Sequence, residues 1–194
     1  MSKTILYIAM SLDGFIAGPN EDLSWLNTYN ESDGGKVTKK VDGDNPYDFK
    51  KFQASVGAII MGRNTYDLEK RNGWENANPF PKFVLSKKPA DPSAAKDVVF
   101  TDEDIAEVLK KAKRITDKTI WVEGGANVAQ QFIEKDLLDE AILFIAPMLL
   151  GGGVSLFGKL DAYKNWKLRR VREYGNGMVQ LEYTIKSDLK GVQL

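Results

Sequence analysis

Short apolar runs that favour strands alternate with amphipathic runs that favour helices along most of this 194-residue chain. Such alternation is typical of an α/β domain with a largely parallel central sheet. Two runs, residues 58–61 and 120–122, contain no polar residue, which predicts central strands that are covered on both faces. The strand-like runs are 4–10, 56–62, 82–86, 97–100, 119–125 and 138–150, and the helix-like runs are 49–55, 104–113 and 127–135.

The C-terminal part follows another pattern. Residues 166–175 and 178–186 alternate apolar and polar side chains on either side of a Gly-Asn-Gly turn signal at 175–177. This arrangement predicts an antiparallel hairpin at one edge of the sheet. The chain length fits one core, so we expect a single domain over residues 1–194.

Cysteine and histidine are both absent from the sequence. Their absence excludes disulfides, metal sites built on thiolate or imidazole groups, and nucleophilic systems that pair serine or cysteine with histidine. An acid or base must then be Asp, Glu, Tyr, Lys or a bound water, and difficult redox chemistry would need a cofactor. We expect no metal site.

Acidic and basic residues balance at 27 each, so no net field attracts a nucleic acid. No apolar run approaches the roughly 18 residues of a membrane helix, and the N-terminus lacks a signal-peptide pattern. We therefore expect a cytoplasmic protein that binds neither nucleic acid nor membrane. The long polar stretch over residues 27–45 is either an active-site flap or an insertion without a role.

One strand-to-helix turn is suited to a phosphate. Gly124 and Gly125 end a buried strand, and an amphipathic helix begins near Ala126. Glycines permit close approach, while the free N–H groups and dipole of a helix start favour an anion. A tight turn needs no ligand to explain it, so this motif alone leaves binding open.

A second turn of the same kind follows the strand that ends at Met61. Gly62 opens it, Arg63 supplies a fork of donors for phosphate, and Thr65 adds a hydroxyl beside a short helix over residues 63–67. A helix with a solvated arginine is the alternative. In a parallel sheet both turns would lie at the carboxyl ends of strands, where ligands of open α/β folds collect.

Two further turns are compatible with a ligand. Ser86, Lys87 and Lys88 end another strand and could hold an extra phosphate, such as the 2′-phosphate that distinguishes NADP from NAD, or form an ordinary surface loop. After Pro147, glycines 151–153 allow either close approach of a ligand or a simple reversal of the chain.

Together and in this order, the motifs resemble the dihydrofolate reductase-like superfamily, most closely the riboflavin-biosynthesis (RibD) C-terminal reductase domain family. The resemblance covers nearly the whole chain. It implies a three-layer dihydrofolate reductase-like fold, with a mostly parallel sheet and an antiparallel C-terminal hairpin. It also implies an NADPH-dependent reductase that forms a homodimer. The matching segments are MSLDGFIAG, MGRNTYD, VLSKKP, WVEGGANVAQQFI and LDEAILFIAPMLLGGGVSLF.

The resemblance also implies positions for the ligands. The nicotinamide of NADPH would lie against the first strand, the pyrophosphate against the glycine turn, and the substrate across the nicotinamide. The implied cofactor residues are Ala9, Ile16, Gly62, Arg63, Thr65, Ser86, Lys87, Gly124, Gly125, Ala126 and Asn127, and the implied substrate residues are Trp25, Pro147 and Gly151.

Two carboxylates are candidates for the catalytic acid. Asp48 looks like the helix carboxylate of dihydrofolate reductases, but it could equally occupy a first helical turn, where a carboxylate favours the dipole. Asp13 is the second candidate, although an Asp-Gly pair is first of all a turn. Glu123, before the glycine pair, would repel a phosphate if it pointed inward, and strand alternation could turn it away.

Two functions are compatible with these residues. The first is hydride transfer from NADPH to a small heterocyclic or ribosyl substrate, of the 5-amino-6-(5-phosphoribosylamino)uracil reductase type. The second is a non-catalytic nucleotide-binding protein that retains the dinucleotide cleft. The zinc deaminase domain that often accompanies riboflavin-pathway reductases needs His and Cys ligands, so we expect a stand-alone reductase-like domain here.

Overall fold

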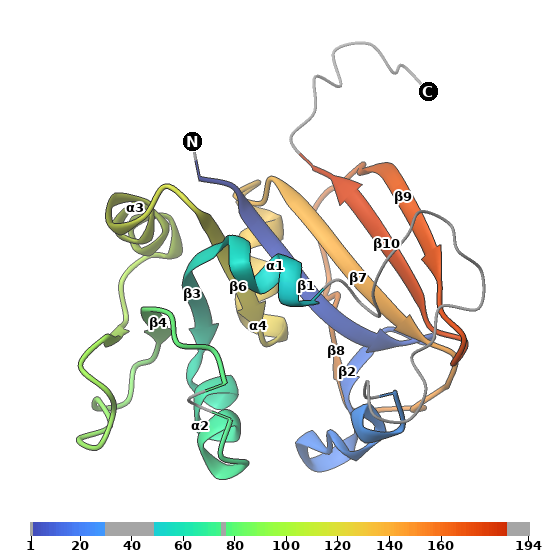
Figure 1. Cartoon of the computed structure of the whole chain (residues 1–194), viewed down its shortest axis with the longest axis horizontal. Helices are drawn as coiled ribbons and strands as arrows, with labels where there is room; N and C mark the ends of the chain where they lie inside the picture. Colours follow the sequence, from blue (N-terminus) through green and yellow to red (C-terminus); the bar gives the residue numbers. More distant parts are fainter. Residues whose placement is uncertain (1, 30–48, 75–76, 186–194) are drawn as a thin grey trace.

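A computed structural model describes residues 2–29, 49–74 and 77–185 of the chain. Its main feature is an eight-stranded sheet with the order β5-β4-β3-β6-β1-β7-β10-β9 (Figure 1). The strands are β1 (Thr4–Ser11), β3 (Val56–Gly62), β4 (Lys82–Leu85), β5 (Val98–Thr101), β6 (Thr119–Gly124), β7 (Glu140–Ala146), β9 (Lys167–Glu173) and β10 (Val179–Thr184).

The pairing of the strands confirms the predicted sheet. All pairs from β5 to β7 are parallel, and only β10 with β7 and β9 with β10 are antiparallel. The C-terminal hairpin therefore lies at one edge, on the right in Figure 1. The two runs without polar residues form β3 and β6, which lie inside the sheet and are almost wholly buried, as predicted.

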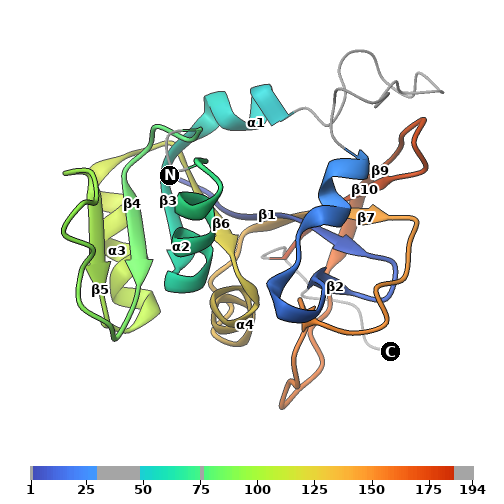
Figure 2. The same cartoon turned by 90° about the horizontal axis from the view of Figure 1, so that it is seen from below.

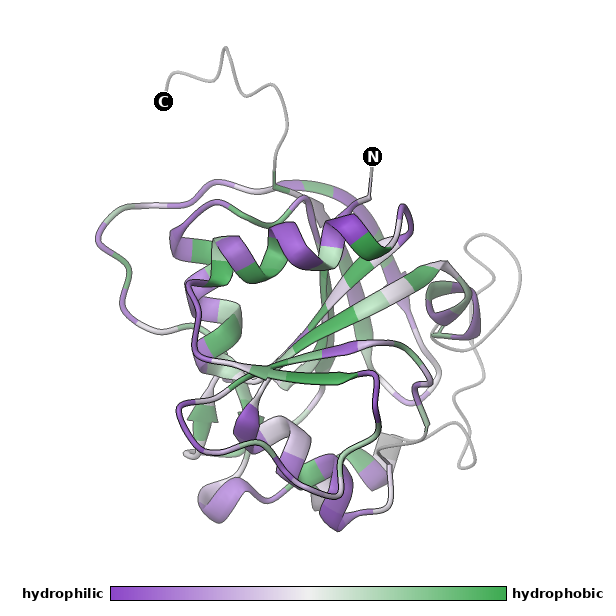
Figure 3. Cartoon of the chain, turned by 90° about the vertical axis from the view of Figure 1, so that its left-hand side faces the viewer, coloured by the Kyte–Doolittle hydropathy of each residue, from purple (hydrophilic) through white to green (hydrophobic). Residues whose placement is uncertain are grey.

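Helices cover both faces of the sheet, which gives three layers. α1 (Phe49–Ser55) and α2 (Arg63–Arg71) pack on one face, where Phe52 and Tyr66 join a core with Trp121. α3 (Ile105–Ile115) and α4 (Ala126–Glu134) pack on the other face. Figure 2 shows α1 and α4 on opposite sides of β1. In Figure 3 the central strands are largely apolar and the helices alternate apolar and polar turns.

A small two-stranded sheet lies beside the main one. β2 (Phe15–Ala17) pairs antiparallel with β8 (Val154–Ser155). The chain continues from β2 into two 3₁₀ helices, η1 (Pro19–Glu21) and η2 (Ser24–Tyr29). Within the described ranges, none of the helices has both the length and the apolar character that crossing a bilayer requires.

The sheet register brings three strand ends together. Gly62 of β3 lies beside Leu85 of β4, and Met61 lies beside Gly124 of β6. α2 begins directly after β3, and α4 begins two residues after β6. α2 extends to Arg71, beyond the predicted range of 63–67, because Tyr66 and Glu69 give it a buried face one turn longer.

Candidate functional site

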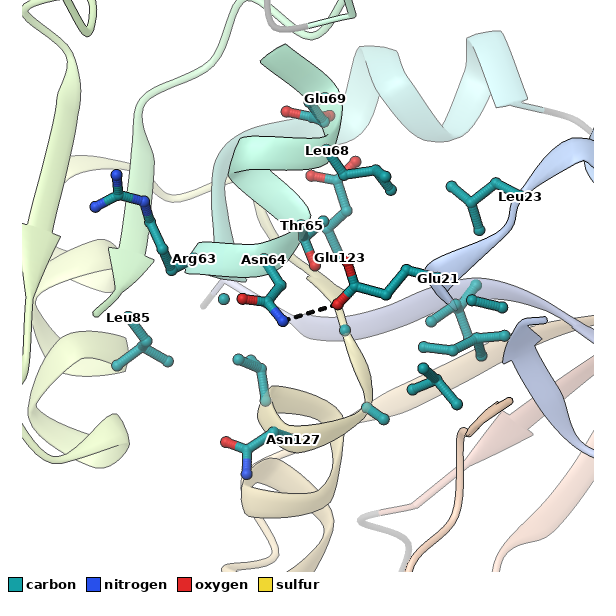
Figure 4. Close-up of a pocket in the computed structure, with 18 of the residues that line it drawn as sticks. Glu21, Leu23, Arg63, Asn64, Thr65, Leu68, Glu69, Leu85, Glu123 and Asn127 are labelled. Carbon is teal, nitrogen blue, oxygen red and sulfur yellow. Dashed lines mark hydrogen bonds between the residues drawn. The ribbon is translucent and has the colours of Figure 1, made fainter. Parts of the chain in front are cut away.

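A cleft of about 740 Å³ opens at the carboxyl ends of β3, β4 and β6. Its walls come from β1, β2, η1, η2, α2 and the start of α4. Figure 4 shows Arg63 and Leu85 on one side of it and Glu21 and Leu23 on the other. Ten of the eleven predicted cofactor residues line this cleft: Ala9, Ile16, Gly62, Arg63, Thr65, Ser86, Lys87, Gly125, Ala126 and Asn127.

Two helix N-termini open into the same cleft. α2 and α4 each begin after a glycine that provides no side-chain cap, and neither helix has an acidic residue in its first turn. Arg63, Lys87 and Lys88 also line this end. Uncapped N–H groups, helix dipoles and cations together favour phosphate groups. We call this end, defined by the two helix starts and these three cations, the basic half of the cleft.

The glycine turn leaves a crevice in the wall of the cleft. A Cβ atom added to Gly125 would lie 3.4 Å from the Thr65 hydroxyl and 3.7 Å from the Ile16 Cδ1 atom. Gly124 has a φ of 106°, which side-chain-bearing residues rarely adopt, and does not itself line the cleft. The peptide bond between the two glycines is cis. The turn thus requires glycine at 124 for its backbone, and at 125 the absence of a Cβ atom leaves a narrow space between Thr65 and Ile16.

Arg63 is held in place at the rim. Its Nε atom donates to Asp67 at 2.7 Å, its Nη1 atom donates to the Pro89 carbonyl oxygen at 2.8 Å, and its guanidinium lies 5.2 Å from the centre of the Phe100 ring. Among the described residues these bonds use only part of the five-donor fork. The remaining N–H groups can serve an anion without rebuilding the side chain.

Two glutamates line the opposite part of the cleft. Glu69 of α2 is 6% exposed, and the Glu123 carboxyl of β6 is hydrogen-bonded to it. Burial, followed by the negative charge of Glu69 and that hydrogen bond, raises the pKa of Glu123 well above its ordinary value, and the Lys82 charge partly opposes this. The pair therefore favours a protonated Glu123 bonded to the Glu69 carboxyl group.

The surroundings of the glutamates are apolar. Tyr7, Leu23, Leu68 and Trp121 line the cleft around them. The Trp121 indole N–H donates to the Tyr7 carbonyl oxygen at 3.2 Å, which fixes the orientation of the ring. We call this part, the two glutamates with these four side chains, the acidic half. It can hold a flat apolar molecule against a proton-bearing carboxyl pair.

One hydrogen bond crosses the mouth of the cleft. The Asn64 side-chain amide on α2 donates to Glu21 Oε1 of η1 at 2.9 Å, as the dashed line in Figure 4 marks. An Arg71 nitrogen lies 3.7 Å from the other Glu21 oxygen. Asn20 and Glu21 both have positive φ angles, 57° and 60°. The local backbone thus directs a carboxylate across the opening, toward the start of α2.

Asp13, one predicted catalytic acid, does not line the cleft. Its carboxylate accepts hydrogen bonds from the Ser11 hydroxyl and from the N–H groups of Leu150 and Gly151, at 3.1 and 2.8 Å. The Ser11 bond, followed by the bonds from Gly151 and Leu150, lowers the pKa of Asp13. With its pKa lowered, the Asp13 carboxyl is ionised near neutral pH and holds no proton to donate. It ties the turn after β1 to the loop after β7. Asp48, the other candidate, lies outside the described residues.

The three predicted substrate residues are also away from the cleft lining. Trp25 is 5% exposed and packs in a core with Phe144 and Tyr174. Gly151 donates to Asp13 from the loop that follows Pro147. Trp25 is thus used for packing, and Gly151 holds the turn. The predicted stretch 27–45 lies outside the described residues from position 30 onward.

Sequence reasoning missed Glu69 and left the direction of the Glu123 side chain open. The open question for Glu123 was its direction, and the strand register answers it: its side chain lines the cleft, on the same face of the sheet as Trp121. A carboxylate in an otherwise apolar buried strand was the available signal. For Glu69 the signal was an acidic residue three positions after Tyr66, on the same face of a helix.

The chain matches the family model described as the RibD C-terminal domain over residues 2–180. A curated relative, the uncharacterized protein YwjB of Bacillus subtilis (strain 168), is 32% identical over 183 residues, which cover 93% of this chain and 97% of YwjB.

Several solved structures have a similar fold. A putative riboflavin biosynthesis protein from Shewanella sp. PV-4 has a TM-score of 0.78 at 28% identity, covering 95% of this chain and 99% of that one. The Thermotoga maritima deaminase/5-amino-6-(5-phosphoribosylamino)uracil reductase has 0.64 at 18%, covering 95% and 56%. Enterococcus faecalis dihydrofolate reductase, solved with NADP(H), has 0.58 at 17%, covering 95% and 97%. The last two likenesses concern the fold, which is dihydrofolate reductase-like as predicted.

Proposed function

The chain belongs to the RibD C-terminal domain family, and from this premise we propose that it is an NADPH-dependent reductase of a small heterocyclic or ribosyl substrate. One observation carries the proposal. A single cleft joins a basic half suited to a dinucleotide and an acidic half that holds a proton. A reductase needs a cofactor site and a proton source side by side, and here Glu123 directly precedes the glycine turn.

The residues of the basic half fit NADPH. Two uncapped helix starts face the cleft, and the space beside Gly125, between Thr65 and Ile16, would be filled by a Cβ atom. Ala126 and Asn127, at the start of α4, would hold the pyrophosphate. Arg63 and Lys87 would hold the 2′-phosphate, and Ala9 and Ile16 would lie beside the nicotinamide.

When bound, NADPH supplies a hydride to an electrophilic C=N or C=O carbon. The protein's own contribution is orientation, exclusion of water and one proton. Glu123 holds that proton at its carboxyl group and gives it to the nitrogen or oxygen of the reduced bond, with Glu69 as its hydrogen-bond partner. Leu23, Leu68 and Trp121 keep the acidic half apolar.

A non-catalytic nucleotide-binding protein is the second candidate, as before. The buried carboxyl pair favours a reductase over a non-catalytic protein, because binding a nucleotide does not require a protonated carboxyl pair beside the glycine turn. Assembly as a homodimer is a further part of the proposal that rests on the family, and a cytoplasmic location stays a prediction.

The test measures oxidation of NADPH in the presence of each member of a panel of ribosylated pyrimidines and pterins. The loss of NADPH absorbance gives the rate. We expect a rate that falls as pH rises through the raised pKa of Glu123, and a Glu123→Gln variant that is roughly 100-fold slower. Glu107→Gln, on the exposed surface of α3, is the matched control. NADPH binding without turnover of any panel member would support the nucleotide-binding reading instead.

A further inference from the structure

The charges of the cleft are separated along α2. Arg63 lies in its first turn, and Glu69 lies six residues later, about 9 Å farther along the helix axis. Lys87 and Lys88 follow β4 and lie in the basic half with Arg63. Among the described residues, these three are the cations that line the cleft, so none lines its acidic half.

The cation whose charge acts on the Glu123 carboxyl is Lys82, and its ammonium group already has a partner. Lys82 is 5% exposed, its ammonium group donates to the Asn78 carbonyl oxygen at 2.8 Å, and it does not line the cleft. A phosphate in the acidic half would therefore meet two glutamates and apolar side chains. Like charges in a partly desolvated cleft repel each other strongly, and an unpaired buried phosphate is costly.

The acidic half is suited to a ligand that donates hydrogen bonds. The Glu123 Oε2 atom is buried and has no N–H or O–H donor of the described residues beside it. A pair of carboxyl groups that shares one proton keeps oxygen lone pairs that can accept further hydrogen bonds. A buried oxygen of this kind is satisfied by an N–H or O–H donor on a ligand. The apolar side chains of the acidic half, including Leu68 and Trp121, suit the face of a flat ring.

We propose that the substrate of this cleft is an unphosphorylated nitrogen heterocycle, uncharged or cationic, that presents N–H donors to the Glu69–Glu123 pair. This inference rests on the proposed reductase function and narrows it. The proposed substrate differs from the phosphoribosylamino substrates of other reductases, because the phosphate-binding groups of this cleft bind only the phosphates of the cofactor.

The experiment compares matched ligands that differ only by one phosphate. Each amino-substituted pyrimidine or pterin nucleoside is paired with its 5′-phosphate, and both are titrated into the NADPH-loaded protein by calorimetry and assayed for NADPH oxidation. We expect the unphosphorylated member to bind at least roughly tenfold more tightly. In Glu69→Gln the difference in affinity between each nucleoside and its 5′-phosphate should shrink severalfold, while the affinity for NADPH stays unchanged. Glu107→Gln should leave both this difference and the NADPH affinity as in the wild type.

The outcomes separate this inference from the function on which it rests. Tighter binding of the phosphorylated members, or no binding of any unphosphorylated member to protein that binds NADPH normally, overturns the inference and leaves NADPH binding intact. The inference is also overturned if Glu69→Gln leaves the difference in affinity between phosphorylated and unphosphorylated ligands unchanged, since the acidic half would then not cause that difference. Failure to bind NADPH at all would overturn the reductase function itself.

Discussion

Glu123 is the residue whose surroundings most restrict what the cleft can do. It lies in the wall of the cleft beside the glycine turn, and burial and Glu69 both favour its protonated form. Because its pKa is raised, the folded state binds more protons than the unfolded state between the ordinary value of 4.5 and the raised one. The free energy of unfolding must therefore fall as pH rises through that window.

Glu123→Gln should remove this dependence on pH. The amide keeps the volume and can still donate to Glu69, but it cannot ionise. We expect the variant to gain stability relative to wild type as pH rises from about 5 to about 8, by about 1.4 kcal/mol for each unit of pKa shift within the range. Thermal unfolding of both proteins over this range measures the difference. Parallel curves would mean that Glu123 ionises as it does in water.

Arg63→Ala tests the cation of the basic half. The guanidinium lies at the cleft rim, held by Asp67 and Pro89. Its loss should weaken the binding of NADPH roughly tenfold more than the binding of NADH, because NADH lacks the 2′-phosphate. Titration of both nucleotides by tryptophan fluorescence measures the two losses. Arg114→Ala, at the end of α3, is the control. Equal losses for the two nucleotides would mean that Arg63 does not contact the 2′-phosphate.

At the scale of elements, the pairing of β2 with β8 builds one wall of the cleft. Ile16, Ala17 and Val154 of these strands line it. Gly153 makes the pairing possible, because it has a φ of 122° and a Cβ atom there would lie 2.1 Å from the Ala17 carbonyl oxygen. No side chain can be accommodated without moving backbone.

Gly153→Ala should thus lower the free energy of unfolding by about 1–3 kcal/mol and weaken nucleotide binding through the displaced wall. Gly152→Ala is the matched control, since a Cβ at this neighbouring position meets no atom within 4 Å. Urea unfolding measures both. If Gly153→Ala is as stable as Gly152→Ala, the close approach of β8 to β2 is not required.

The elements themselves were largely predictable. Strand and helix positions follow from periodicity, and the mostly parallel sheet and the antiparallel C-terminal hairpin agree with the family resemblance. The basic half was also predicted, because glycine turns at strand ends are local signals. Glu69 was not found, because its place beside Glu123 depends on how α2 packs against the sheet, where it contacts β3 and β4. No spacing in the sequence records that contact.

At the scale of the whole molecule, segments that are far apart in the sequence together form the cleft. Its lining residues come from elements as distant in sequence as β1 and β8, and run from Tyr7 to Val154. The parallel sheet brings their ends to one edge, and the carboxyl pair and the glycine crevice thereby become neighbours. Dinucleotide binding at this edge is the central claim, since both the reductase function and the choice of substrate depend on it.

Titration of the wild type and Gly125→Ala with NADPH, followed by energy transfer from tryptophan, tests that claim most directly. Gly125 has a φ of −69°, which alanine adopts freely, so the variant should fold, while its methyl group enters the space between Thr65 and Ile16. We predict micromolar binding by the wild type and by Gly152→Ala, and a loss of roughly tenfold or more in Gly125→Ala. Unchanged affinity in Gly125→Ala, or no binding by the wild type, would contradict the account.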